Sequence, residues 1–217
     1  MQDSLTRLSS GLPELDNILR GGFVVGCSYL IRGGPGQGKT TLGCHFLASA
    51  GELVNALFIG FQEPESQIRM NAEAMGIDVS KVHFLSLAPD EHFFTQQQTY
   101  DVFSASDVEQ EPLAEAIVKA VESLKPTHIF FDSMSQLRFL SSDLYQYRKQ
   151  VLSLLNYFNR HRSTILFTSE RSSEIPDEDL QFIADGVITL DAAPIGAFLE
   201  VSKFRGSGFM PGAHQMR

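Results

Sequence analysis

One stretch of the chain, Gly33 to Thr41, constrains the fold more than any other. Its sequence, GGPGQGKTT, matches the pattern G-x-x-x-x-G-K-[ST] at every fixed position. A β-branched and aromatic run, Cys27 to Arg32, comes directly before it, and apolar residues at helical spacing follow it. A strand, a glycine-rich loop and a helix in this order predict a loop that holds the phosphates of a nucleotide.

The residue types in this loop explain how it would hold phosphate. Glycines let backbone N–H groups approach phosphate oxygens closely, and the helix that begins near Lys39 adds its positive end. In such loops the lysine reaches the β- and γ-phosphates, and the hydroxyl at the position of Thr40 ligates Mg²⁺. The alternative is a glycine-rich turn that binds nothing. The predicted nucleotide-binding residues are Gly34, Gly36, Gln37, Gly38, Lys39, Thr40 and Thr41.

Length and charge limit the classes of protein to which the chain can belong. Its 217 residues are enough for one α/β domain with a sizeable core. Its net charge of −9 counts against tight binding to nucleic acid or to an anionic membrane. No apolar run reaches membrane-spanning length and Met1 starts no signal peptide, so we expect a cytoplasmic protein. We expect Cys27 and Cys44 to be buried free thiols.

Strand and helix patterns alternate through most of the chain. Apolar runs predict strands at residues 27–32, 56–61, 82–86, 128–131, 163–168, 187–190 and 198–203. Helical spacing, together with residues that start and stop helices, predicts helices at residues 12–19, 39–50, 64–75, 112–124, 143–162 and 177–183. Residues 87–111 have neither pattern and predict a long loop. This order predicts an α/β fold with a mainly parallel twisted sheet, helices on both faces and a C-terminal antiparallel hairpin.

Polar residues follow several of the predicted strands, at the point where each strand ends. Besides the phosphate-binding loop, they are Gln62-Glu63, Asp132-Ser133 and Thr168-Ser169-Glu170. Ligands of such sheets bind at the carboxyl ends of the strands, so we expect these residues to converge around one nucleotide. Asp132 is expected to hold the Mg²⁺ shell together with Thr40. The alternative is that Asp132 is an ordinary turn residue.

Hydrolysis of a nucleotide also needs a group that orients or deprotonates the attacking water. Glu63 is the acidic candidate for this role. Gln62 can orient a water but cannot accept its proton. The alternative is that both residues only cap the helix that follows Pro64.

The chain resembles a KaiC-type domain of the RecA-like P-loop ATPase superfamily. The ordered motifs that carry the resemblance are SGLPELD at 10–16, GGF at 21–23, the loop at 33–41, FQE at 61–63, FDS at 131–133, TSER at 168–171, ADGVI at 184–188, KFRG at 203–206, and Gly212 with His214. These motifs span nearly the whole chain, so we expect a single domain over residues 1–217. KaiC relatives often carry a second domain, so the alternative is that this domain is one part of a tandem protein.

The resemblance implies more than the residues alone. KaiC-like domains assemble into hexameric rings with ATP between neighbouring subunits. By this likeness Lys203 and Arg205 would approach the phosphates bound by the next subunit and stabilise charge there. Without the resemblance, both would be read as solvated basic residues on an edge strand. The expected catalytic residues are therefore Glu63, Gln62, Lys39, Lys203 and Arg205.

The chain departs from the family pattern in two places. The family usually has paired glutamates after the second strand, of which the first is generally taken as catalytic, whereas this chain has Gln62 followed by Glu63. Gln181 and Phe182 stand near the positions where the autokinase domain of circadian KaiC has Ser and Thr, so this domain resembles the non-phosphorylated kind.

Together these features favour a ring-forming regulatory ATPase that binds ATP with Mg²⁺ and hydrolyses it slowly. One alternative is an ATP-dependent assembly scaffold with little or no catalysis. The other is a RecA- or RadA-like DNA recombination ATPase, against which the net charge of −9 counts.

Overall fold

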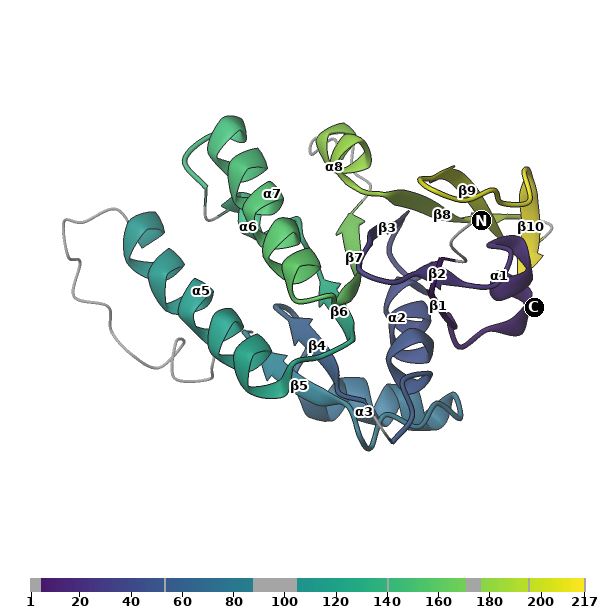
Figure 1. The fold of residues 1–217 in the computed structure, drawn as a ribbon, viewed down its shortest axis with the longest axis horizontal. Helices are drawn as coiled ribbons and strands as arrows, with labels where there is room; N and C mark the ends of the chain where they lie inside the picture. The colour runs from purple at the N-terminus through teal and green to yellow at the C-terminus, as the bar shows by residue number, and fades with distance from the viewer. Residues whose placement is uncertain are drawn as a thin grey trace.

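The computed structural model describes residues 5–52, 54–87, 105–139, 141–170, 177–194 and 196–216, with only the backbone described at 105–111 and 170. The strands of its main sheet are β3 (Ser28–Gly33), β4 (Ala56–Gly60), β5 (His83–Ser86), β6 (His128–Asp132), β7 (Thr164–Glu170), β8 (Gly186–Ala193), β9 (Gly196–Phe204) and β10 (Ala213–Met216). They lie in the order β10-β9-β8-β3-β7-β6-β4-β5 (Figure 1). The pairs from β8 to β5 are parallel, and β9 and β10 are antiparallel.

Helices cover both faces of this sheet (Figure 1). On one face lie α1 (Pro13–Ile18), α2 (Lys39–Ala48) and α3 (Glu65–Ala74). On the other lie α5 (Ala105–Leu124), α6 (Gln136–Phe139), α7 (Leu144–Arg160) and α8 (Glu178–Ile183). The structure therefore confirms the predicted α/β architecture.

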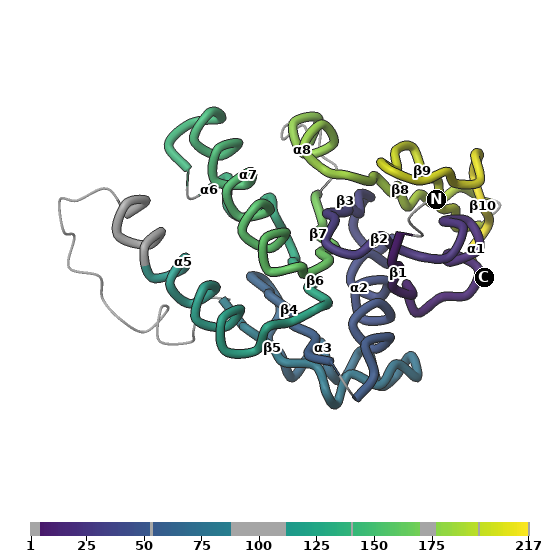
Figure 2. Tube along the Cα trace, in the orientation of Figure 1, coloured from purple at the N-terminus to yellow at the C-terminus, as the bar shows by residue number. Residues whose placement is uncertain are grey.

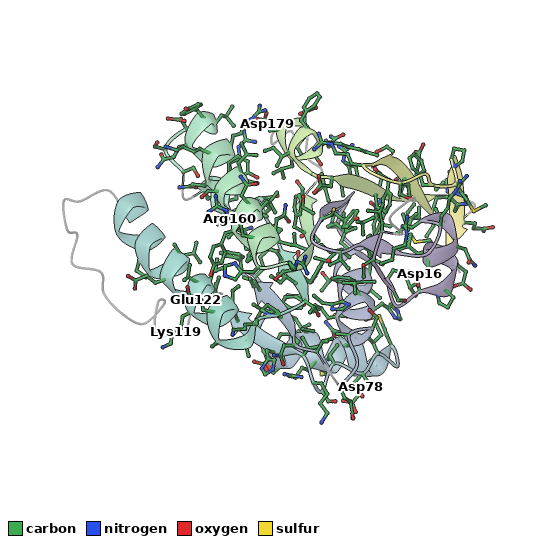
Figure 3. All side chains as sticks on the ribbon, in the orientation of Figure 1. Asp16, Asp78, Lys119, Glu122, Arg160 and Asp179 are labelled. Atoms are coloured by element: carbon green, nitrogen blue, oxygen red, sulfur yellow. The ribbon has the colours of Figure 1, made fainter. Side chains whose placement is uncertain are left out.

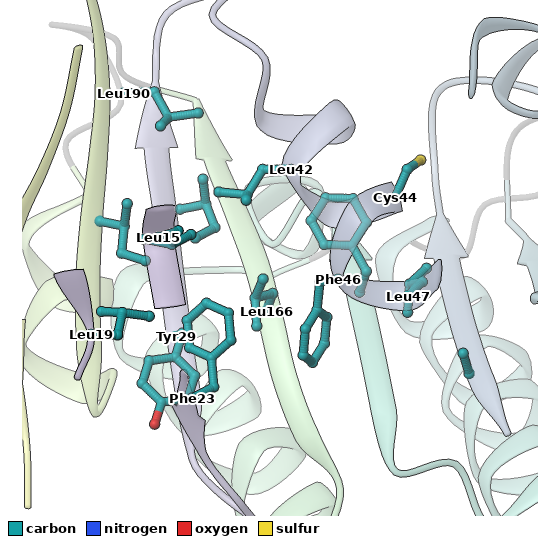
Figure 4. Close-up of a cluster of buried hydrophobic side chains, with 14 of the residues drawn as sticks. Leu15, Leu19, Phe23, Tyr29, Leu42, Cys44, Phe46, Leu47, Leu166 and Leu190 are labelled. Atoms are coloured by element: carbon teal, nitrogen blue, oxygen red, sulfur yellow. The ribbon is translucent and has the colours of Figure 1, made fainter. Parts of the chain in front are cut away.

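The central strands are apolar because both of their faces are covered. In β6, Phe130 packs into the core under α2, while Ile129 and Phe131 pack into the core under α7. Figure 4 shows part of the first core, in which Phe46 of α2 packs against Phe23. Both cysteines are free, as predicted, but only Cys44 is buried, whereas Cys27, directly before the central strand β3, is partly exposed.

The N-terminal residues form a small unit beside the C-terminal strands (Figure 2). Here β1 (Arg7–Leu8) pairs antiparallel with β2 (Phe23–Val24). Arg7 donates to the backbone oxygen of Gly22 at 2.8 Å and to the hydroxyl of Ser207 at 2.5 Å. The sequence predicted α1 but not this pair of strands, because two-residue strands are too short to show a periodic pattern.

The predicted C-terminal hairpin is confirmed by the antiparallel pair β8 and β9, and β10 adds a third antiparallel strand that the sequence did not predict. The predicted helix start at Pro112 was wrong, since α5 begins at Ala105 and Pro112 lies inside it. Proline is common in the first turn of a helix, but the preceding residues ASDVEQE contain enough helix formers to extend α5 in spite of one lost hydrogen bond. Residues 88–104 of the predicted loop lie outside the described residues.

Gly43 sets how closely α2 approaches the sheet. A Cβ at this position would lie 2.3–2.4 Å from three ring carbons of Phe130, which is fully buried. We expect Gly43→Ala to lower the free energy of unfolding by about 1–3 kcal/mol, because a close-packed core cannot make room for a methyl group without strain. Denaturant unfolding measures this change. Alanine is otherwise the better helix former by about 1 kcal/mol, so a more stable variant would mean that the ring moves aside.

Candidate functional site

The phosphate-binding loop connects β3 to α2, and its shape depends on glycine. Gly36 and Gly38 have φ angles of +72° and +87°, a conformation that side chains disfavour. A Cβ on Gly33 would lie 2.6 Å from the side-chain oxygen of Gln37 and 2.8 Å from the backbone oxygen of Leu190. Lys39 is the first residue of α2, so the positive end of that helix faces the loop.

Lys39 and Gln37 hold the loop in its present shape. The ammonium nitrogen of Lys39 lies 2.9 Å from the backbone oxygen of Gly33 and 2.8 Å from that of Gly34. The side-chain oxygen of Gln37 accepts a hydrogen bond from the Gly34 amide, and its amide group donates to Asp191 at 3.3 Å. Phosphate oxygens can replace the loop carbonyls as acceptors for the Lys39 ammonium, with a stronger, charge-assisted bond.

Asp132, the last residue of β6, holds two hydroxyl groups. The Thr40 hydroxyl donates to one carboxylate oxygen at 2.7 Å, and the hydroxyl of Thr168 on β7 donates to the other at 2.5 Å. The structure thus brings together the two residues predicted to hold Mg²⁺, although they are far apart in the sequence.

The chemistry of these donors suits Mg²⁺. This hard cation prefers oxygen ligands and usually takes one or two protein groups together with phosphate oxygens and water. Within the described ranges, no three His, Cys, Asp or Glu side chains gather closely enough to hold a metal ion by themselves. A hydroxyl beside a single carboxylate therefore fits a cation that arrives with a triphosphate better than a permanent metal centre.

The same residues line a cavity of about 490 Å³, which is within the usual size of small-molecule sites. Gly36, Lys39, Thr40 and Asp132 form one part of its wall. Gln62 and Glu63, which follow β4, form another part and are exposed. The predicted convergence of strand ends is therefore present for the loop, for β4 and for β6.

Lys203 and Arg205 lie elsewhere in this chain. Phe204 between them pairs with Gly186 at the start of β8, and Gly186 pairs with Tyr29 of β3. Tyr29 comes four residues before Gly33. At about 3.3 Å per residue, this places the two basic residues roughly 13 Å along the strand from the loop.

Both basic side chains contact the carboxyl end of α8. The ammonium of Lys203 donates to the backbone oxygens of Gln181 at 2.8 Å and Phe182 at 3.0 Å, and Arg205 donates to that of Phe182 at 3.3 Å. Burial, with a smaller contribution from Arg205, lowers the pKa of Lys203. Asp185 lies 3.6 Å from the Arg205 guanidinium. The pair is therefore held on α8, and is not simply extended into solvent.

An ion pair that was not predicted lies beside the loop. Arg32, directly before Gly33, donates to both carboxylate oxygens of Asp177 at 2.9 Å and 2.7 Å. Asp177 is only 5% exposed. The signal in the sequence was a charged residue in a buried apolar strand, because such a residue needs a partner. Of the polar residues predicted after β7, the side chains of Glu170 and Arg171 lie outside the described part.

The sequence of the chain is similar to those of several known proteins. The family model described as "ATPase: KaiC" matches residues 8–217. The circadian clock oscillator protein KaiC of Prochlorococcus marinus is 27% identical over 218 residues, which cover 95% of this chain and 41% of the relative. The circadian clock protein KaiC3 of Synechocystis sp. is 26% identical over 227 residues, covering 97% of this chain and 43% of the relative.

A shorter similarity extends to the DNA repair protein RadA of Salmonella typhimurium, which is 36% identical over 84 residues, or 39% of this chain and 18% of the relative. The chain spans about two-fifths of the length of the circadian clock relatives that it matches. In the parts of the chain that the structure describes, every helix is too short or too polar to cross a membrane.

Proposed function

Because the chain belongs to the KaiC family of ATPases, we propose that it binds ATP with Mg²⁺ at the loop Gly33–Thr41 and hydrolyses it slowly within a ring of identical subunits. The convergence of Lys39, Thr40 and Asp132 with Glu63 on one cavity supports this proposal most strongly. A titration with ATP in the presence and absence of Mg²⁺, followed by a phosphate-release assay, tests it.

Each group has a role that follows from its chemistry. The loop amides and Lys39 bind the β- and γ-phosphates, and Thr40 with Asp132 would hold the cation. Bound there, Mg²⁺ offsets the negative charge that builds up on the phosphates during hydrolysis. Glu63 accepts the proton of the attacking water, and Gln62 orients that water.

Gln62→Glu should raise the rate of ATP hydrolysis. The change supplies a second proton acceptor at the wall of the cavity, at the position where the family usually has a glutamate. General-base help is typically worth roughly 100-fold in rate, so an increase of about tenfold or more is expected if the carboxylate reaches the water. Steady-state phosphate release measures it. A variant that binds ATP with unchanged affinity and is no faster would mean that residue 62 is not near the attacking water.

The position of Lys203 and Arg205 supports a ring in which nucleotide lies between subunits. Within one chain they are held on α8, roughly 13 Å along β3 from the phosphate-binding loop. Contact between this pair and a bound triphosphate is therefore expected from a neighbouring subunit. Such contact forms charge-assisted hydrogen bonds only across the interface, so nucleotide and neighbour bind cooperatively.

Arg205→Ala should weaken assembly more than it weakens ATP binding. We expect the protein concentration for half-assembly in ATP-Mg²⁺ to rise at least tenfold or so, because one charge-assisted hydrogen bond per interface is typically worth about 1.5–3 kcal/mol. Light scattering measures assembly, and a fluorescence titration at low protein concentration measures binding. Arg160→Ala at the end of α7 is the matched control and should behave as the unmodified protein (Figure 3). Equal loss of binding and assembly would contradict the role in trans.

One observation favours a second function. Gln62 occupies the position of the usual catalytic glutamate, so ATP can act as an assembly signal without significant turnover. Rings that form with ATP-Mg²⁺ but release no phosphate above background would establish such a scaffold.

A further inference from the structure

Helix α8 is fixed at both ends by contacts with residues of the proposed ATPase site. At its amino end, Asp177 accepts two hydrogen bonds from Arg32, at 2.9 Å and 2.7 Å, and one from the Gln181 side chain at 2.8 Å. At its carboxyl end, the backbone oxygens of Gln181 and Phe182 accept from Lys203, and that of Phe182 accepts from Arg205. The helix therefore connects the strand that enters the phosphate-binding loop with the two basic residues.

We propose that Arg32 and Asp177 are positioning residues for Lys203 and Arg205: they fix α8 on β3, and α8 holds the two cations where a neighbouring subunit's triphosphate meets them. This inference rests on the proposed function, in which the pair acts in trans. It adds a polar connection from the loop of one subunit to the cations that the same subunit presents to the next.

The length of α8 explains why its end contacts matter. A helix of six residues has almost no stability of its own, so its position depends on what it touches. The ion pair is suited to fix it, because a guanidinium and a carboxylate joined by two parallel hydrogen bonds allow little rotation. Asp177 is 5% exposed, so removing its charge also leaves Arg32 with an unpaired charge in a partly buried site.

The carboxyl end of α8 explains how the effect reaches the cations. Lysine and arginine side chains have many rotamers. Restricting them to one rotamer on binding costs conformational entropy, which lowers the affinity of the contact. The carbonyls of residues 181 and 182 hold both head groups in one arrangement. If α8 moves, these acceptors move with it, and the cations lose their fixed arrangement.

Opposite defects in two variants distinguish this proposal from a general structural role of Asp177. Asp177→Asn should bind ATP on its own loop but present its cations poorly to the neighbour. Lys39→Ala should do the reverse, because it lacks the loop ammonium but keeps an intact α8. Each variant alone should therefore show little assembly in ATP-Mg²⁺. Mixed together, they should form interfaces in which ATP on one variant meets well-placed cations of the other.

The experiment is an equimolar mixing test, read by analytical ultracentrifugation and by phosphate release in ATP-Mg²⁺. The reference mixture is Arg205→Ala with Lys39→Ala, and the test mixture is Asp177→Asn with Lys39→Ala. Both mixtures should give complexes of two or more subunits that neither variant forms alone. Asp179→Asn is the matched control on the same helix, since Asp179 pairs with Arg148 on the exposed surface, and it should assemble as the unmodified protein (Figure 3).

The outcomes separate the action of Lys203 and Arg205 in trans from the positioning role of Asp177. A reference mixture that fails to assemble would overturn the proposed action in trans. A reference mixture that assembles, beside a test mixture that does not, would overturn the positioning role, because Asp177 would then act on its own loop. Asp177→Asn that assembles alone as the unmodified protein does would overturn it as well. If Asp177→Asn fails to fold, Arg32→Lys takes its place, since it keeps the charge but cannot form the paired hydrogen bonds.

Discussion

Lys39→Ala should weaken ATP binding by roughly 100-fold or more, because hydrogen bonds to charged groups contribute about 1.5–3 kcal/mol each and the ammonium is expected to reach two phosphates. In the structure this ammonium lies 2.9 Å and 2.8 Å from two backbone oxygens of the loop, at the wall of the cavity. A fluorescent ATP analogue, titrated at a protein concentration that keeps subunits apart, measures the affinity.

The matched control removes a lysine outside the phosphate-binding loop. Lys119 is exposed on α5, which covers the opposite face of the sheet from α2, and it does not line the cavity, so Lys119→Ala should bind ATP as the unmodified protein does (Figure 3). If Lys39→Ala bound ATP with unchanged affinity while remaining folded, the loop would not be the site of the triphosphate.

Glu63→Gln should reduce the rate of ATP hydrolysis by roughly 100-fold while ATP affinity changes little, because an amide keeps the size of the side chain but cannot accept the proton of the attacking water. Glu63 lines the cavity together with Asp132 and Thr40, so it borders the space in which a bound triphosphate would lie. Single-turnover phosphate release, with enzyme in excess over ATP, measures the chemical step separately from product release.

Glu122→Gln provides the control for this substitution, since Glu122 is exposed on α5 and does not line the cavity (Figure 3). It should leave the rate unchanged. An unaltered rate in Glu63→Gln as well would place the general base at another residue, or leave the reaction to water and the bound cation alone.

Much of the fold could be predicted because its elements repeat simple patterns. Apolar runs identified the buried strands, 3.6-residue spacing identified α7, and Pro64 with Gly76 marked the two ends of α3. Ser142 and Asp143 are both residue types that cap helices, and in the structure the Asp143 carboxylate accepts from the Gln146 amide at 2.8 Å. The alternation of strand and helix then determined a mainly parallel sheet, whose carboxyl ends bring Thr40 and Asp132 together.

Other features depend on contacts that no local pattern records. The strands β1 and β2 are held by pairing with each other and by Arg7, whose partner Ser207 is 200 positions away. The start of α5 was misplaced because proline is favoured in the first turn of a helix, whereas α5 continues through Pro112 in spite of the hydrogen bond that is lost there. The partner of Arg32 could not be chosen from the sequence, which offers 26 acidic residues.

The place of Lys203 and Arg205 illustrates the same limit for the site. Their motif suggested phosphate contact, but only the register of β9 on β8, and of β8 on β3, shows that they lie away from the loop of their own chain. That separation is consistent with the contact in trans that the family resemblance implies.

The most direct test of this account is the mass of the unmodified chain in solution, measured by sedimentation velocity without nucleotide, with ADP-Mg²⁺ and with ATP-Mg²⁺. We expect single subunits or small complexes without nucleotide, a ring with ATP-Mg²⁺, and weaker assembly with ADP-Mg²⁺ because the γ-phosphate is missing from the interface. A chain that binds ATP-Mg²⁺ and remains a single subunit would contradict the ring, and a ring equally stable without nucleotide would contradict the coupling between ATP and assembly.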